Sequence, residues 1–332
     1  MYSFGEIIGN EALVKRVKNA VSLKKTPHAY IIAGRDGSGK TLLAKTIAKA
    51  MQCPDKINGE PCLNCVSCRT FDSGNHPDVI YVHTDGKKSL GIDVIREQIS
   101  DSILTKPYKY EHKIFILEDA GAMTPQAQNA FLKTLEEPAG YGFFLLTSNG
   151  TGNFFPTVLS RAAVLKIRPV PDEAVKKYLL RNGFTEDEAE ICSAHSGGSV
   201  GRALRLKEDE KFAAAREFTK SVIEALIVPG NRNSPEAAFA LAQGFEPFKD
   251  NIAETLGMLY GMLKDVLIFK SSGDAGKITE RGAAGLIKEA ASLLSVKEIL
   301  YKLDAANETI IKLRYNANFK MAADAAALQL LD

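Results

Sequence analysis

"IIAGRDGSGKTLLAKTIAKAMQC", residues 31–53, decides the fold of this chain. The apolar run at its start predicts a buried strand, and the stretch that begins at Lys40 has the periodicity of an amphipathic helix. Between them, Gly34 is followed after four residues by Gly39, Lys40 and Thr41, which is the GxxxxGK[ST] pattern of a phosphate-binding loop. A chance match in a loop is the alternative, but the flanking strand and helix supply the context that the pattern requires. The stretch therefore predicts an α/β domain with a nucleotide site.

Each residue type in this loop has a chemical reason to be there. The glycines, Gly34, Gly37 and Gly39, let the backbone curl until its N–H groups face the phosphates. Lys40 neutralises the β- and γ-phosphate oxygens, and the Thr41 hydroxyl can ligate Mg²⁺. We therefore expect ATP and Mg²⁺ as cofactors.

Composition and charge bound the class of protein. The 332 residues are 45% hydrophobic and 25% charged, as in an ordinary globular chain of two or three domains. The formal net charge of +2 is nearly neutral, so any contact with nucleic acid must come from a local patch. The N-terminal "MYSFGEIIGNE" has acids where a signal peptide has basic residues, and no later stretch has the length and apolarity of a membrane span. We expect a cytoplasmic protein without a membrane partner.

Four of the five cysteines, Cys53, Cys62, Cys65 and Cys68, lie within one short segment. Their spacing lets four thiolates converge tetrahedrally on a soft divalent ion, which predicts a zinc site. An iron–sulfur cluster and two disulfides are the alternatives. A cytosolic chain disfavours disulfides, and the segment lacks the ending of a ferredoxin motif. With four cysteine ligands no coordination position is left open, so the predicted role of the metal is structural.

An acidic pair follows a second strand-like run, in "HKIFILEDAGAMT". Nucleotide hydrolysis commonly uses an aspartate for the Mg²⁺ shell and then a glutamate that polarises the attacking water. Here the order is reversed, Glu118 before Asp119, so each carboxylate is displaced by about one methylene, an error that can cost ~10²-fold in rate. We expect binding to survive this better than turnover. The alternative is that the pair only caps the next helix.

The order of the motifs resembles a known family. In sequence they are "HAYIIAGRDGSGKT", the cysteine cluster, "HPDVIYV", "KIFILEDAGAMTPQAQNAFLKTLEEP", "FFLLTSN" and "PTVLSRA". Together they resemble the AAA+ subunits of bacterial DNA polymerase III clamp loaders. The resemblance runs from about Phe4 to Leu206 and continues more weakly to "IIKLRYNANFKMAADAAALQLL", which is similar to the last collar helices of the family. The gamma/tau motor subunit typically has a "YRP" segment before the fold and "DE" as its acidic pair. Here the fold starts without "YRP" and the pair is "ED", so the chain looks most like the delta-prime type.

The resemblance implies roles for further residues. Ser148 and Asn149 match the first sensor of the γ-phosphate, and Arg202 matches the second sensor on the lid. Arg161 matches the arginine finger of the family's Ser-Arg motif, which acts in trans on the ATP of a neighbouring subunit. Judged from the residues alone, Arg161 is a cation suited to a surface ion pair. Likewise, the turn before Arg202 is an ordinary helix entry with Ser199 as a plausible cap.

Breaks rich in glycine and polar residues, together with a change in the apolar pattern along the chain, predict three domains. We expect an AAA+ nucleotide-binding domain with the cysteine module over 1–168 and a small helical lid over 169–207. Long amphipathic stretches without strand-like runs predict an all-helical collar over 208–332. The fold class is thus an α/β P-loop domain, a parallel sheet flanked by helices, with helical lid and collar.

These features together predict a subunit that helps to load a sliding clamp onto primed DNA. The implied partners are the gamma/tau and delta subunits, the sliding clamp and primer-template DNA, with Lys133 and "KPYKYEHK" as candidate phosphate contacts or simply a solvated face. Nothing resembles a polymerase site. Two alternatives stay open: a gamma/tau-type motor ATPase and a stand-alone AAA+ DNA remodeller. Whether the chain hydrolyses ATP by itself is left open too.

Overall fold

The chain forms two compact units, which we describe separately. A computed structural model describes residues 2–83, 89–315 and 317–332; Asn316, within the collar-like stretch quoted above, lies outside them. The α/β unit comprises the chain up to Val175 together with Gly197–Arg202, and the helical unit comprises Lys176–Ser196 and Ala203–Asp332. The division into three domains at 168/169 and 207/208 stays a prediction.

The α/β unit is built on a five-stranded sheet in the order β2-β3-β4-β1-β5, and every neighbouring pair is parallel. Its strands are β1 (Ala29–Ala33), β2 (Val79–Val82), β3 (Lys113–Leu117), β4 (Gly142–Ser148) and β5 (Ala163–Lys166). Because all strands run the same way, the segments that follow them meet at one edge of the sheet. The glycine-rich loop after β1, the acidic pair after β3 and the residues after β4 are thereby brought together.

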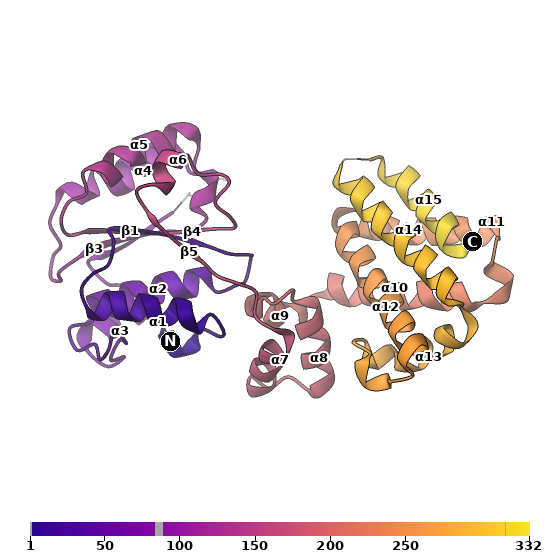
Figure 1. Ribbon diagram of the computed structural model, residues 1–332. Coiled ribbons are helices and arrows are strands. Elements are labelled where there is room, and N and C mark those ends of the chain that lie inside the picture. The colour runs from indigo at the N-terminus through magenta and orange to yellow at the C-terminus, as the bar shows by residue number, and fades with distance from the viewer. Residues whose placement is uncertain (1, 84–88, 316) are drawn as a thin grey trace. The chain divides into compact units, whose positions relative to one another are not determined.

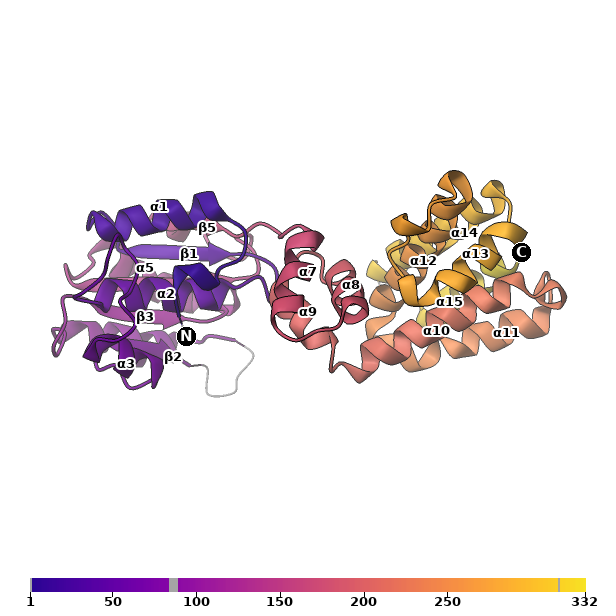
Figure 2. The ribbon, with the colours of Figure 1, turned by 90° about the horizontal axis from the view of Figure 1, so that it is seen from below.

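Helices cover both faces of this sheet, as Figure 1 shows. One face carries α1 (Glu11–Ser22), α2 (Lys40–Gln52) and α3 (Val66–Asp72), which lie toward the viewer in Figure 2; the other carries α4 (Ile92–Ile95), α5 (Pro125–Glu136) and α6 (Pro156–Leu159). Alternate residues of each strand enter different cores: Ile32 packs in the cluster with Leu43 of α2, and Ile31 in the cluster with Phe131 of α5. Burial on both faces explains why these strands are continuous apolar runs.

Single turns join these elements. They are η1 (Phe4–Glu6), the π-turn η2 (Arg96–Ser100), η3 (Ser102–Leu104) and η4 (Ala120–Ala122).

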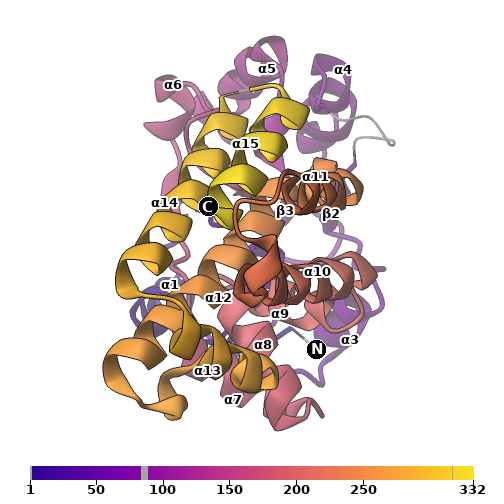
Figure 3. The same ribbon diagram turned by 90° about the vertical axis from the view of Figure 1, so that its right-hand side faces the viewer.

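In the part of the helical unit that the structure describes, the regular elements are all helices. Its helices are α7 (Asp172–Arg181, which begins in the α/β unit), α8 (Glu186–His195), α9 (Val200–Leu206, which also begins in the α/β unit), α10 (Glu210–Ile227), α11 (Pro235–Gly244), α12 (Ile252–Ser272), α13 (Ala284–Leu293), α14 (Val296–Arg314) and α15 (Phe319–Leu331). They are joined by short 3₁₀ helices, η5 (Pro229–Asn231), η6 (Glu246–Asn251), η7 (Ala275–Lys277) and η8 (Arg281–Ala283). Figure 3 shows α14 beside α15. Fully buried side chains such as Ile223, Leu259 and Ile287 form its core. No helix among the described residues has the length and apolarity to cross a bilayer.

A buried carboxylate joins two parts of the helical unit. Glu280, only 2% exposed, accepts from Arg216 Nε at 2.9 Å and lies 2.6 Å from His195 Nε2 at the end of α8. Burial by itself raises the pKa of Glu280, but the hydrogen bond with His195 and the charges of Arg216 and His195 outweigh it, so the pKa is lowered overall.

This lowered pKa predicts an acid-sensitive contribution to stability. A carboxyl group whose pKa is lower in the folded than in the unfolded chain stabilises the fold above its unfolded pKa, and this stabilisation disappears as pH falls through the folded value. We expect Glu280→Gln to lower the free energy of unfolding by about 1–3 kcal/mol at neutral pH, because the two basic partners lose a charged acceptor. The loss should shrink as pH falls below the ordinary glutamate pKa and through the lowered value of the folded chain. Urea unfolding across a pH series measures it; a pH-independent difference from the unmodified chain would contradict the assignment.

Candidate nucleotide site and metal cluster

The glycine-rich loop has the backbone that its sequence predicts. Gly37 and Gly39 have φ of +69° and +90°, in the left-handed region that favours glycine. A Cβ on Gly34 would lie 2.6 Å from Ser38 Oγ, so no larger residue fits there without displacement. Ser38 Oγ itself is buried and has no hydrogen-bond partner among the described atoms. The loop opens directly into the 13-residue helix α2, whose N-terminus favours an anion. These residues fit a polyphosphate.

The side chain of Lys40 reaches back across the phosphate-binding loop. Its Nζ donates to the backbone carbonyls of Gly34 at 2.9 Å and Arg35 at 2.8 Å, and to Asn149 Oδ1 at 2.8 Å. Burial lowers the pKa of Lys40, while the charges of Asp36 and Asp119 act in the opposite direction. The ammonium group is thus already held over the loop, where phosphate oxygens can replace these acceptors. Thr41 follows in the first turn of α2.

The acidic pair lies exposed after β3, at the same edge of the sheet. Glu118 Oε1 lies 3.3 Å from Nζ of Lys45, one helical turn after Thr41. The Lys45 ammonium also lies 5.2 Å from the ring centre of Tyr81 and 5.8 Å from that of Tyr2. Sequence reasoning missed Lys45, although its place one turn beyond Thr41 on α2 was a signal that could have found it.

Asp119 has a distinct backbone position. Its φ is +50°, and its N–H donates to Thr147 Oγ1 at 3.1 Å. It precedes the single turn η4, but its side chain makes no capping hydrogen bond to that turn. The capping alternative for this side chain therefore gains no support.

The two sensor candidates after β4 differ in their surroundings. Asn149 reaches Lys40, as described above. Ser148 is 2% exposed, and its hydroxyl donates to the carbonyl of Gly150 at 2.7 Å. Asn149, rather than Ser148, is therefore the side chain placed next to the phosphate-binding loop.

Arg202 belongs to the glycine-rich turn that we define as residues 197–202. Its backbone N–H donates to Ser199 Oγ at 3.2 Å, as in a helix cap, and its backbone nitrogen lies 2.6 Å from the place of a Cβ on Gly37. The structure thus brings the backbone of Arg202 against the phosphate-binding loop.

Arg161 lies at the opposite edge of the sheet. It precedes β5, and β5 runs parallel to β1 with Ala163 beside Tyr30, whereas the phosphate-binding loop follows the other end of β1. Strand β5 extends ~13 Å from Ala163 to the level at which the phosphate-binding loop begins, so Arg161 and this loop lie at opposite ends of the strands. Arg161 instead pairs with Glu136 Oε1 at 2.8 Å and donates to the carbonyl of Thr157 at 3.0 Å. Within this unit it is an ion-paired cation remote from the chain's own loop.

The four clustered cysteines converge as predicted. Their sulfur atoms all lie within 4.8 Å of one another, with Cys53 to Cys65 at 3.9 Å and Cys62 to Cys68 at 4.0 Å. A disulfide needs an S–S distance of about 2.05 Å, and none of the four cysteines forms one. Tetrahedral Zn–S bonds of about 2.3 Å place sulfur atoms about 3.8 Å apart. The donor set and spacing therefore fit zinc.

Backbone N–H groups donate hydrogen bonds to sulfur atoms of the cluster, and such bonds favour the thiolate form. The N–H groups of Cys62, Cys65 and Cys68 donate to the sulfurs of Cys53, Cys62 and Cys65 at 3.3, 3.4 and 3.4 Å. Burial raises the pKa of Cys62, but hydrogen bonds from the N–H groups of Asn64 and Cys65 and with the side chains of Cys65 and Cys53 together outweigh it and lower the pKa to about 7. Burial raises the pKa of Cys68.

The cysteine loop also anchors its neighbours. Glu60 accepts from the Phe4 N–H at 2.8 Å and pairs with Lys18 of α1 at 2.7 Å. Lys49 of α2, fully buried, pairs with Asp72 of α3 at 2.7 Å. A folded loop thus holds the N-terminal segment and the helix that follows the phosphate-binding loop.

The basic segment "KPYKYEHK" is only partly available for contacts. Lys113 is buried and donates to the Ser102 carbonyl at 2.6 Å, whereas Lys109 and Tyr108 are exposed, Tyr108 to 85%. Asp78 holds the segment by accepting N–H bonds from Tyr108, Lys109 and Tyr110. Lys133 is exposed on α5.

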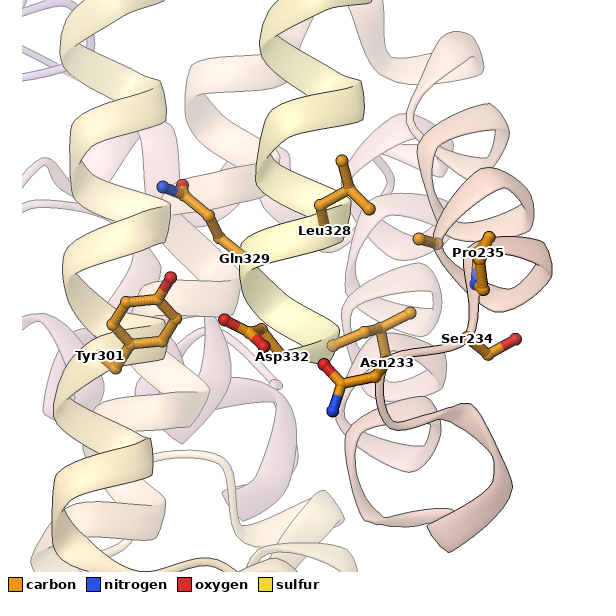
Figure 4. A pocket seen from close by; sticks show the side chains of 9 residues that line it. Asn233, Ser234, Pro235, Tyr301, Leu328, Gln329 and Asp332 are labelled. Carbon is orange, nitrogen blue, oxygen red and sulfur yellow. The ribbon is translucent and has the colours of Figure 1, made fainter.

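A separate pocket of about 240 Å³ lies in the helical unit (Figure 4). It is lined by Asn233, Ser234, Pro235, Ala238, Tyr301, Leu328, Gln329, Leu331 and Asp332. None of the site residues predicted from the sequence lines it.

The fold and site define the class of the protein. A parallel sheet in which β4 separates the phosphate-loop strand from the acidic strand, followed by a helical C-terminal region, is the architecture of an AAA+ P-loop protein.

Comparison with known proteins shows which family the chain is similar to. The family model described as "DNA polymerase III, delta subunit" matches residues 9–171. The DNA polymerase III subunit gamma of Buchnera aphidicola subsp. Acyrthosiphon pisum is 31% identical over 62% of this chain and 58% of its own length. The subunit delta' of Bacillus subtilis is 27% identical over 96% of this chain and 95% of its own. These matches support a member of the clamp-loader AAA+ family of DNA polymerase III subunits, of the gamma/tau and delta-prime type.

Two further facts accompany this assignment. The chain spans 58% and 65% of the length of the two Buchnera gamma subunits that it matches. A DNA polymerase III gamma subunit-related protein from Thermotoga maritima is similar with a TM-score of 0.45 at 18% identity, over 98% of this chain and 100% of that one.

Proposed function

We propose that this chain is a delta-prime-type subunit that helps to load a sliding clamp onto primed DNA. The observation that carries the proposal is the position of Arg161. A guanidinium at the sheet edge opposite the chain's own phosphate-binding loop is out of reach of its own nucleotide, so an arginine finger there acts on a neighbour. The delta' relative, matched over nearly its whole length, supports the same assignment.

The chain's own site is proposed to bind ATP more readily than to hydrolyse it. Lys40 and the loop N–H groups hold the phosphates, and Asn149 and Arg202 sense the nucleotide. Thr41 and the acidic pair would hold Mg²⁺, which screens phosphate charge when bound. Two features oppose turnover: Glu118 stands where an aspartate is usual, and it pairs with Lys45. With the reversed pair, the shorter arm of Asp119 reaches less far toward an attacking water.

The other partners follow from the same proposal. The sister subunits are of the gamma/tau and delta kinds, and the complex acts on a sliding clamp and primer-template DNA in the cytoplasm. On α14 the large apolar side chains Val296, Leu300, Tyr301 and Ile311 are 44–47% exposed, which suits a helix that contacts sister subunits. Zinc, held by the four cysteines, acts structurally.

A reconstitution experiment tests the assignment. The chain should co-elute with gamma/tau and delta subunits in one complex, and that complex should load a clamp onto primed DNA only when the chain is present. Failure to enter any such complex would favour the stand-alone remodeller.

The second candidate is a gamma/tau-type motor ATPase. It is favoured by the intact phosphate-binding loop and by relatives named gamma and tau. Steady turnover of ATP by the isolated chain, abolished by Lys40→Ala, would select the motor over the delta-prime type.

Lys40→Ala also tests nucleotide binding. Loss of the ammonium removes charge-assisted bonds to the phosphates, so we expect ATP affinity to fall ~10- to 100-fold. Calorimetric titration with ATP measures it, and Lys133→Ala, an exposed lysine on α5, is the matched control with unchanged affinity. Equal affinity of the Lys40 variant and the unmodified chain would contradict the site.

A further inference from the structure

The backbone of the phosphate-binding loop accepts two hydrogen bonds from the glycine-rich turn 197–202. Ser199 Oγ donates to the carbonyl of Asp36 at 2.8 Å, and the Gly201 N–H donates to the carbonyl of Gly37 at 2.9 Å. Ser199 is 3% exposed, and the same oxygen accepts from the Arg202 N–H. One buried hydroxyl therefore joins the loop to the first turn of α9.

The two segments also lie so close together that neither Gly37 nor Gly201 has room for a side chain. A Cβ on Gly201 would lie 2.7 Å from the Gly37 carbonyl oxygen, and one on Gly37 would lie 2.6 Å from Ser199 Oγ. Separations under 3 Å force atoms apart, so both glycines are required for this contact.

The two hydrogen bonds fix the direction of the loop N–H groups. In a trans peptide the C=O and the N–H point in opposite directions, and the described residues contain no cis peptide bond. Holding the Asp36 carbonyl against Ser199 therefore turns the Gly37 N–H away from the turn. The Gly37 carbonyl, held by Gly201, does the same for the Ser38 N–H. The Ser38 N–H donates within the loop to the Arg35 carbonyl at 3.2 Å, which keeps the loop curled. The Gly37 N–H is a loop donor of the kind that faces phosphate.

From these contacts we infer that Ser199 is a positioning residue: it orients the phosphate-binding loop and couples nucleotide binding to the order of the turn 197–202. The inference rests on the proposed ATP site and adds its regulation. A phosphate that orders the loop also orders the turn through the Ser199 and Gly201 bonds, and loosening the turn costs nucleotide affinity by the same linkage.

Two variants break the contact in different ways. Ser199→Ala removes the hydroxyl, while Gly201→Ala keeps all hydrogen-bonding groups and inserts a methyl against the Gly37 carbonyl. Each should weaken ATP binding by about 3- to 10-fold, the range expected for losing neutral hydrogen bonds. Gly257→Ala, where a Cβ meets open space, and Ser221→Ala, an exposed serine on α10, are the matched controls and should bind ATP normally.

Hydrogen exchange in the full chain separates coupling from a merely structural role. In the unmodified chain, saturating ATP should slow exchange of the amides in 197–202. In Ser199→Ala and Gly201→Ala, ATP at saturation should still slow exchange in the phosphate-binding loop but no longer in the turn. Variants with unchanged ATP affinity and unchanged protection of the turn would overturn this inference alone. An unmodified chain that binds no ATP would overturn it together with the proposed function.

Discussion

Replacing Arg161 by alanine is expected to lower ATP hydrolysis at the neighbouring subunit's site by roughly 10³-fold or more, the usual contribution of an arginine finger. The effect should appear only in the assembled complex, because Arg161 lies at the sheet edge away from its own phosphate-binding loop. The isolated chain should bind ATP as before. Single-turnover hydrolysis by the DNA-bound complex, with the chain present in unmodified or variant form, measures the change.

Two further variants separate the trans role from a local ion pair. Glu136→Gln removes the side-chain partner of Arg161 within the chain and should leave the complex active, since the finger must leave Glu136 to act. Arg161→Lys keeps the charge but not the planar fork, and should recover only part of the activity. If Arg161→Ala were as active as the unmodified chain, or if Glu136→Gln were equally inactive, the ion pair and not the finger would be the function of this arginine.

Removal of the metal is expected to have the second large effect, on stability. A metal held by the folded cluster stabilises the fold, and zinc contributes about 10–16 kcal/mol in zinc-finger peptides. Weaker binding of the metal to the cysteines of the unfolded chain would offset part of this stabilisation. A loss on the order of 5 kcal/mol predicts a fall of ~10–20 °C in the unfolding midpoint of the α/β unit. The measurement is calorimetry with and without a strong chelator, together with elemental analysis of the purified chain.

Cysteine variants provide the matched pair for this experiment. Cys65→Ser should lose the metal and most of the stabilisation, whereas Cys192→Ser, a buried cysteine outside the cluster, should keep the metal. Zinc at about one ion per chain supports the assignment. Iron with visible absorption would show a cluster of the iron–sulfur kind, and a chain without metal that loses two thiol pairs on oxidation would favour disulfides.

Local sequence patterns predicted the parts of the fold that local physics determines. The strand, loop and helix around Lys40 and the strand before Glu118 are continuous apolar or periodic segments, and their patterns are unambiguous. The cysteine cluster was equally clear, because four ligands in one segment need no knowledge of the rest of the fold. The short strand β5 has only four residues after the Ser-Arg motif, and its pattern was too brief to predict.

The contacts within the site could not be predicted in the same way. Lys45 meets Glu118, and Ser199 meets Asp36, across more than 70 and 160 residues of chain respectively. Such pairs depend on how strands and turns are placed in space, and periodicity carries no information about them. The position of Arg161 at the opposite edge likewise required the register of β5 beside β1.

The most direct test is the position of the Arg161 guanidinium in the assembled complex, determined by cryo-electron microscopy with a slowly hydrolysed ATP analogue on primed DNA. The account predicts that this guanidinium has left Glu136 and lies within hydrogen-bond distance, about 3 Å, of the γ-phosphate bound by the adjacent subunit. A guanidinium still paired with Glu136, with no phosphate of another subunit near it, would contradict the delta-prime assignment.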